Sequence, residues 1–274
     1  MNRVRRAICS TLDSRMQSHF TSFDVVDWSA SAVVVAPHPD DETLGCGGVA
    51  IKKLKRGAKL HFVFVTDGGA SHSHRMTAEK LRINREAEAV EAVSRLGGTA
   101  DCVTFLRIPD GSAARHVEAI SGAIAPLLDR MRPGGIFVTH AKEPPSDHVA
   151  VNSAVWRALR ACQRQVTVYE YPIWYWYHWP WMGFCPDLPG LGRLKLKQTL
   201  TSLAGLRALS ALNTIAYVGD VIELKRAALN AHASQMISPA GEDDWPTLPK
   251  LCNGDFIKRL MRSYEVFMRY EFKP

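Results

Sequence analysis

The sequence predicts an α/β fold built on a doubly wound, mostly parallel sheet. Five short apolar runs, most of them rich in β-branched residues, are each followed by a turn or by a longer helical pattern as far as residue 171. Such alternation is typical of repeated βα units around a parallel sheet. Ionisable side chains also directly follow the first of these runs and begin the helix after the fourth, and ligands of such sheets bind at that edge.

The predicted elements can be read in chain order. The strands are expected at 32–36, 60–66, 102–106, 135–139 and 166–171, and helices at 43–56, 77–96, 117–130 and 148–163. The second of these helices stops at Gly97 and Gly98, which is an expected C-terminal signal. In the common strand order 3-2-1-4-5, the first and fourth strands are neighbours.

Beyond Tyr171 the pattern changes. Residues 171–190 are rich in aromatic residues and proline and are interpreted as a loop or lid, and a Leu-rich basic stretch follows at 191–212. Helices are expected near 220–235 and 255–269. Because no repeat or low-complexity linker is present, we expect one domain over 1–274, with a core at 30–172 and a lid with C-terminal helices at 173–274.

Composition narrows the classes of function. The 34 Lys and Arg against 27 Asp and Glu give a net charge of +7, but the basic residues are scattered, so we expect no nucleic-acid partner. Six widely spaced cysteines without a CxxC pair indicate a reduced, intracellular protein. The N-terminus lacks the apolar run of a signal peptide, and no stretch approaches the roughly 20 apolar residues of a spanning helix. We therefore expect a cytoplasmic protein, which could also form a homo-oligomer.

The motif that carries chemistry directly follows the first predicted strand. It holds His38, Asp40 and Asp41, and His148 begins the helix after the fourth predicted strand. Because those strands are expected to be neighbours, these side chains should converge at one edge of the sheet. A turn with an Asp N-cap would explain Pro39 and one aspartate, but it does not explain three ionisable groups within four residues.

Two histidines and one carboxylate suit a catalytic zinc site with an open position. His38, Asp41 and His148 are the predicted ligands, and Asp40 is the predicted base that activates water. Asp147 could orient the ring of His148 or cap its helix. Iron, cobalt or nickel could bind the same donors.

The stretch A-P-H-P-D-D-E-T-L-G-C-G-G resembles the signature of the PIG-L/LmbE family of zinc-dependent N-acetylglucosamine deacetylases. The resemblance continues through Thr66-Asp67-Gly68-Gly69, Arg85-x-x-Glu88, Pro109-Asp110-Gly111, Asp147-His148 and Ala231-His232-x-Ser234-Gln235. It implies a Rossmann-like fold, zinc on His38, Asp41 and His148, and Asp40 as the general base. It also implies that Arg85 and Asp110 contact an amino-sugar substrate.

One position departs from the family pattern. Many members have H-P-D-H around the last ligand, and the first of those histidines stabilises the oxyanion or donates a proton; Pro145 stands here instead. Pro cannot donate a proton, so either Asp40 acts as both base and acid or another histidine substitutes. The candidates are His140, His178 and His232, and His232 is preferred.

Rival interpretations remain open at this level. A non-haem iron enzyme also uses two His and one carboxylate, although the alternating βα pattern argues against it. A catalytically weakened sugar- or nucleotide-binding module could use Gly45-Cys46-Gly47-Gly48, but helix packing explains these glycines better.

The aromatic residues of 169–181 suit a sugar face, and with Arg193, Lys195 and Lys197 they could also rest on a membrane. A small soluble amino-sugar conjugate is the expected substrate.

Overall fold

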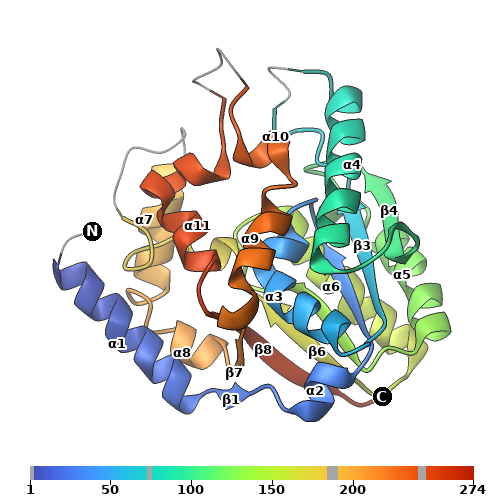
Figure 1. The fold of residues 1–274 in the computed structure, drawn as a ribbon, viewed down its shortest axis with the longest axis horizontal. Helices are drawn as coiled ribbons and strands as arrows, with labels where there is room; N and C mark the ends of the chain where they lie inside the picture. The colour runs from blue at the N-terminus through green and yellow to red at the C-terminus, as the bar shows by residue number, and fades with distance from the viewer. Residues whose placement is uncertain (1–2, 73–75, 184–190, 240–244) are drawn as a thin grey trace.

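A computed structural model describes residues 3–72, 76–183, 191–239 and 245–274, and Figure 1 shows their arrangement. Alternate residues of the central strands pack on opposite faces of one sheet. Val34 and Ala36 belong to the apolar cluster that includes residues of α3 and α4, whereas Val33 and Val35 belong to the cluster that includes residues of α5 and α6. Helices therefore cover both faces, as predicted for a doubly wound sheet.

The sheet has eight strands in the order β1-β7-β8-β6-β5-β2-β3-β4. The strands are β1 (Thr21–Ser22), β2 (Ala32–Ala36), β3 (Leu60–Thr66), β4 (Val103–Ile108), β5 (Gly135–Thr139), β6 (Val166–Tyr171), β7 (Thr214–Tyr217) and β8 (Tyr264–Phe272). The five predicted strands are β2 to β6, and they pair in parallel in the predicted order 3-2-1-4-5. Four of them have the predicted bounds, and β4 begins one residue later and ends two residues later than expected.

The helices follow the predicted pattern as far as β6. They are α1 (Arg3–His19), α2 (Val25–Ser29), α3 (Asp41–Lys55), α4 (Ala78–Leu96), α5 (Val117–Met131), α6 (Ser146–Cys162), α7 (Leu191–Thr201), α8 (Ala208–Ala211), α9 (Ile222–Leu229), α10 (Ala233–Met236) and α11 (Asp255–Leu260). The sequence analysis did not identify α1 and α2. The single helix expected near 220–235 is divided into α9 and α10.

The C-terminal part differs from the prediction of a helix over 255–269. That helix ends at Leu260, and β8 follows, paired antiparallel with β6 and with β7. The run Tyr264–Phe272 holds four aromatic residues, and it buries Glu265 and Phe267 two residues apart. This period of two is that of a strand, and pairing on both sides favours it over the helix.

The described part of the aromatic segment is core. Tyr171, Tyr175, Trp176, Tyr177 and Trp181 are all buried in the larger apolar cluster. The sequence analysis interpreted this segment as a loop or lid. Residues 184–190 of the predicted lid lie outside the described residues.

The glycines of the Gly-Cys-Gly-Gly run in α3 serve helix packing, as predicted. A Cβ at Gly45 would lie 2.1 Å from the Tyr171 ring, and one at Gly48 would lie 2.7 Å from Val218. Both distances are shorter than real contacts allow. The run therefore lets α3 approach β6 and the segment after β7 closely.

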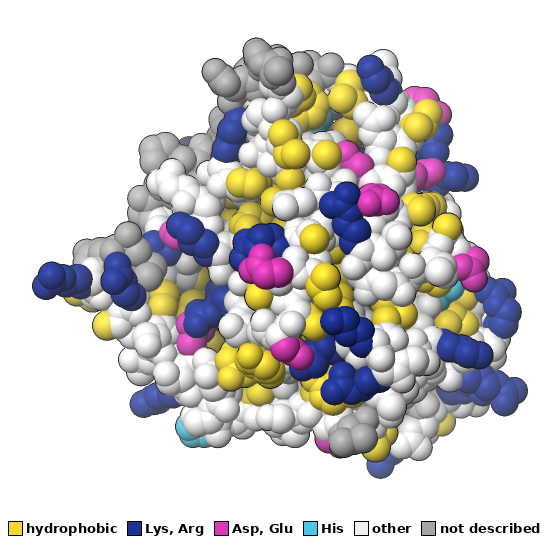
Figure 2. Space-filling view, viewed as in Figure 1, with side chains coloured by type: hydrophobic (Ala, Val, Ile, Leu, Met, Phe, Trp, Pro, Cys, Tyr) yellow, Lys and Arg dark blue, Asp and Glu magenta, His cyan; other side chains and the backbone are white. Residues whose placement is uncertain are grey.

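Charged side chains are spread over the face shown in Figure 2, where Lys and Arg stand among Asp and Glu. Within the described residues, none of the helices has the length and hydropathy needed to cross a bilayer.

Candidate metal centre and catalytic groove

The site forms where β2 and β5 end side by side. His38 follows β2, Asp41 is the first residue of α3, and His148 lies in the first turn of α6, which follows β5. Because β2 and β5 are paired in parallel, their carboxyl ends bring these three side chains together. The sequence predicted this convergence.

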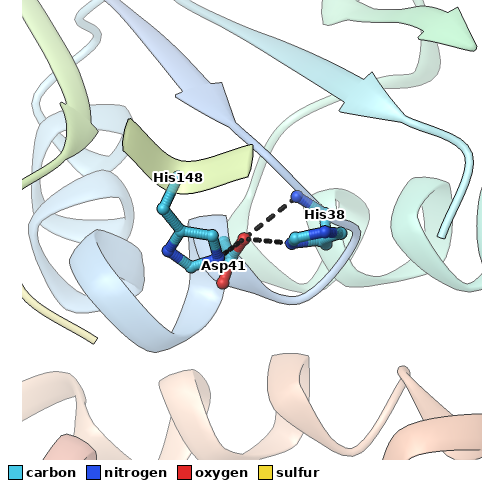
Figure 3. Close-up of side chains that lie close together, drawn as sticks. All are labelled: His38, Asp41 and His148. Atoms are coloured by element: carbon cyan, nitrogen blue, oxygen red, sulfur yellow. Dashed lines mark hydrogen bonds and ion pairs between the residues drawn. The ribbon is translucent and has the colours of Figure 1, made fainter. Parts of the chain in front are cut away.

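Asp41 lies between the two imidazoles (Figure 3). Its Oδ2 atom is 3.2 Å from Nδ1 of His38 and 3.3 Å from Nε2 of His148. One ligand atom from each residue fits within 4.8 Å, so the group could hold a metal ion. Two imidazole nitrogens and one carboxylate oxygen are the donor set of catalytic sites that keep a position open.

The other edge of His38 faces two more carboxylates. Its Nε2 atom lies 3.1 Å from Oδ1 of Asp110 and 3.5 Å from Oδ2 of Asp147. Burial lowers the pKa of His38, but hydrogen bonds to the three aspartates outweigh it and raise that pKa well above its usual value. Burial raises the pKa of Asp110, and the bond from His38 reverses this to about 2. Asp110, predicted to contact substrate, therefore also holds His38.

Glu143 orients His148, a role that the sequence analysis assigned to Asp147. Oε2 of Glu143 lies 3.2 Å from Nδ1 of His148, and the carboxylate also accepts bonds from the backbone N–H groups of Ile173, Trp174 and Tyr175. Because Nδ1 is engaged, His148 presents Nε2 to Asp41. An acid five residues before the predicted ligand was the available signal in the sequence.

Asp147 performs neither of its two predicted roles, which were to orient the ring of His148 or to cap its helix. Its carboxylate accepts hydrogen bonds from the backbone N–H groups of Gly111 at 2.7 Å and Ala113 at 3.1 Å. The N-cap of α6 is Pro145, with no side-chain cap bond. Asp147 therefore ties the loop after β4 to α6 and faces His38 instead of His148.

Asp40 has an unusual backbone and a shifted pKa. Its φ of 126° lies in the left-handed region, which is rare for a residue other than glycine. Burial raises its pKa to about 7, against the opposing charge of Arg85. The Nη2 atom of Arg85 lies 3.2 Å from Oδ2 of Asp40, and Arg85 also donates to the carbonyl oxygens of Pro39 and Gly68.

His232 lies behind this carboxylate. It is fully buried, and its Nε2 atom lies 2.8 Å from Oε1 of Glu42, whose other oxygen accepts the backbone N–H of Asp40 at 2.9 Å. Burial lowers the pKa of His232, but the Glu42 charge outweighs it and raises that pKa. His232 is thus linked to Asp40 through Glu42 and is not among the groove-lining residues.

A groove of about 350 Å³ opens over the site. Pro145 lines it, but His140 and His178 do not. His140 is bonded to the carbonyl of Ala211 and to the backbone of Lys142, and His178 lines a neighbouring cavity. The remaining lining includes Trp174 of the aromatic segment and Gln235 of the quoted motif. It also includes residues that the sequence analysis did not single out, namely Leu44, Ala70, Ser71, Leu248 and Phe256.

Motifs that the sequence analysis linked only by resemblance meet in space. Glu88 of α4 accepts hydrogen bonds from the backbone N–H of Ser234 at 2.8 Å and from its hydroxyl at 2.7 Å. This pair fixes α10 against α4, and Gln235, the next residue, lines the groove. Gln235 had been quoted within a motif but received no role.

A doubly wound sheet with two histidines and two aspartates at its carboxyl edge has the parts of a metal-dependent hydrolase. The family model described as "PIG-L: GlcNAc-PI de-N-acetylase" matches residues 33–159. A 1D-myo-inositol 2-acetamido-2-deoxy-alpha-D-glucopyranoside deacetylase from Mycobacterium sp. (strain JLS) is 30% identical over 242 residues, which cover 76% of this chain and 75% of that protein. The chain belongs to the PIG-L family of de-N-acetylases, as the sequence motif indicated.

Solved structures share the fold. N,N'-diacetylchitobiose deacetylase from Pyrococcus horikoshii superposes with a TM-score of 0.59 at 19% identity, covering 98% of this chain and 94% of that one. The 4-carboxy-2-hydroxymuconate hydratase GalB from Pseudomonas putida KT2440 has a TM-score of 0.56 at 19% identity, covering 89% of this chain and 96% of that one. At this level of identity the likeness shows the fold alone.

Proposed function

We propose that this protein is a zinc-dependent hydrolase that removes the N-acetyl group from an N-acetylglucosamine-type amino sugar or glycoconjugate. The observation that carries the proposal is the His38–Asp41–His148 group with Asp40 beside it in one groove. Membership of the PIG-L family supports the reaction. The Mycobacterium relative, named for a GlcNAc-type glycoside of inositol, supports the substrate class.

His38, Asp41 and His148 would hold the metal. When bound, zinc supplies a Lewis acid that polarises the acetamide carbonyl and lowers the pKa of water. The two imidazoles and the carboxylate suit zinc, and the Glu143 bond to His148 keeps the required nitrogen facing inward.

Asp40 takes the proton from the attacking water in this mechanism. A general base works best with a pKa near the working pH. Arg85 holds the Asp40 carboxylate at 3.2 Å, and Glu42 holds its backbone N–H. We propose that His232, the preferred substitute acid, instead acts as a positioning residue through Glu42.

The proton then passes from Asp40 to the leaving amine, because Pro145 has no group that can donate a proton. We propose that the amide of Gln235 stabilises the oxyanion, since Gln235 lines the same groove. Arg85 and Asp110 are the proposed polar contacts to the sugar. Trp174, Leu248 and Phe256 offer an apolar wall for a sugar face.

We further propose that residues 1–274 act as one domain in the cytoplasm on a small-molecule substrate. Strands from both proposed parts, 30–172 and 173–274, share one sheet. The free state of Cys9, Cys46, Cys102, Cys162 and Cys252 is consistent with a reducing compartment. Cys185 lies outside the described residues.

The experiment is amine release from a panel of N-acetylglucosamine conjugates by the zinc-loaded protein. Asp40→Asn should lower kcat by about 10²–10⁴-fold with zinc still bound, the range expected for loss of a general base. Asp129→Asn, on the surface, should leave kcat unchanged. Turnover that requires oxygen and iron would support the non-haem iron alternative. Absence of amine release from every conjugate despite bound zinc would count against the deacetylase proposal.

A further inference from the structure

Helix α7 packs Leu194 against the core, but it also buries a lysine and leaves two leucines exposed. Lys195 is 1% exposed, and its Nζ donates to the carbonyl of Gly183 at 2.9 Å. Gln198 donates to the carbonyl of Trp174 at 3.4 Å. Leu196 and Leu200, one turn apart, are 54% and 68% exposed. An amphipathic helix on a globular core normally shows the opposite arrangement, so this face needs an explanation.

The exposed leucines continue into the turn after α7. Leu203 and Leu206 are each 55% exposed. With Leu196 and Leu200 they place four exposed leucines within eleven residues, and we call these the leucine edge. Single exposed apolar residues are common, but a cluster of this kind marks a surface that contacts something apolar.

The chain segment that carries the leucine edge has ionisable side chains of one sign, all of them basic. Residues 191–219 contain no Asp or Glu, and Arg193, Lys197 and Arg207 are exposed. Within the described residues, these three side chains make no ion pair. Leucines flanked by cations are the chemistry of a segment that lies in the interface of an anionic bilayer.

We propose that α7 and the following turn dock the protein on an anionic membrane surface through the leucine edge. The leucine side chains enter the boundary of the acyl chains, and the three cations contact the acidic headgroups. A second copy of the chain is a poorer partner, because an interface formed by the leucine edges of two copies would bring the same cations together. Figure 1 shows α7 at the side of the molecule opposite α5.

The docking segment also borders the catalytic groove. A cavity of about 500 Å³ is lined by Leu194, Lys197 and Arg207 and by Pro144 and Tyr175. Pro145 and Trp174, the neighbours of the last two, line the groove. Docking through α7 therefore holds the groove close to the membrane surface.

The test is flotation of the full chain with vesicles of phosphatidylcholine alone or with about one quarter phosphatidylglycerol. We expect binding to the anionic vesicles, and at least about tenfold weaker binding to neutral vesicles or in high salt. A variant with Ser at all four leucines should lose about tenfold or more of the binding. Gln at Arg193, Lys197 and Arg207 together should remove the preference for anionic lipid.

A matched control carries two exposed apolar residues elsewhere, Val26→Ser and Leu224→Ser, and should bind like wild type. Circular dichroism shows whether each variant is folded. Equal binding of the wild type and the four-leucine variant to anionic vesicles would overturn the proposal. Absence of binding of the wild type to these vesicles would also overturn it. If the wild type is a dimer and the four-leucine variant is a monomer, the leucine edge is instead the contact between two copies of the chain. Because no readout uses turnover, failure of the proposed reaction would not affect this test.

Discussion

Glu143 and His148 form a buried pair in which Oε2 of the glutamate lies 3.2 Å from Nδ1 of the imidazole. The same carboxylate accepts three backbone N–H groups of residues 173–175. One side chain therefore fixes a proposed metal ligand and the start of the aromatic segment, whose Trp174 lines the groove.

Glu143→Gln should weaken zinc binding by about 10–100-fold, because the neutral amide no longer orients and polarises His148. Competition with a chromogenic chelator measures the change in affinity. Glu118→Gln removes a surface carboxylate paired with Arg157 and should leave the affinity unchanged. Unaltered zinc affinity in folded Glu143→Gln would contradict the role given to this residue.

His232→Gln separates positioning from acid catalysis. If His232 acts through Glu42, the amide can keep the bond to Oε1, and kcat should fall by less than about tenfold with the alkaline limb of the pH profile retained. The acid limb should move to higher pH, because the charge of His232 lowers the pKa of Asp40. A proton donor would be lost entirely, and kcat should then fall by about 10²-fold or more. The kcat profile between pH 5 and 9 distinguishes the two, since only loss of an acid removes the alkaline limb.

Gly45→Ala should destabilise the fold by about 1–3 kcal/mol, because the new methyl group overlaps the ring of Tyr171. Gly122→Ala, inside α5 with nothing within 4 Å, should stabilise it by about 0.5–1 kcal/mol through helix propensity. Urea unfolding of both variants measures these opposite signs. A stabilised Gly45→Ala protein would disprove the close packing of α3 on β6.

His178 should make stability depend on pH in the mildly acidic range. Burial lowers its pKa from 6.5 to about 4, so the unfolded chain binds more protons between these values. Its contribution is complete above pH 6.5 and is lost as the pH falls toward 4, on the order of 2 kcal/mol between pH 7 and pH 5. Urea unfolding at both pH values should show a smaller loss for His178→Asn than for wild type. The surface variant His19→Asn should behave like wild type.

The strands and their order could be predicted because each is a short apolar run with little competition from a helical period. The three proposed ligands could be predicted because they follow strands that must be neighbours. Glu143 and His232 could not be assigned in this way. Their partners, His148 and Glu42, are set by loop conformation and by the packing of α9 and α10, which no local pattern encodes.

The strand β8 was missed for a related reason. Its four aromatic residues suit a strand, but no pattern in the sequence indicates that two separated strands, β6 and β7, leave a position between them. Pairing on both sides is a tertiary effect, and it overrides local propensity.

The exposed leucines of α7 were described from the sequence only as part of a basic Leu-rich stretch. The buried contacts of Lys195 and Gln198 in the structure show which face of the helix is outside.

The position of β8 in the chain also determines the stage of translation at which the sheet can be completed. Among the described residues, seven of the eight strands precede it in the chain, yet β8 alone joins β1 and β7 to the rest of the sheet. While the ribosome is still making residues before 264, the nascent chain can pair β2 to β6, but β7 and the N-terminal strand have no partner that links them to it. The groove-lining helices α10 and α11 lie between β7 and β8 in the chain, so the site closes late, when translation has passed the last strand.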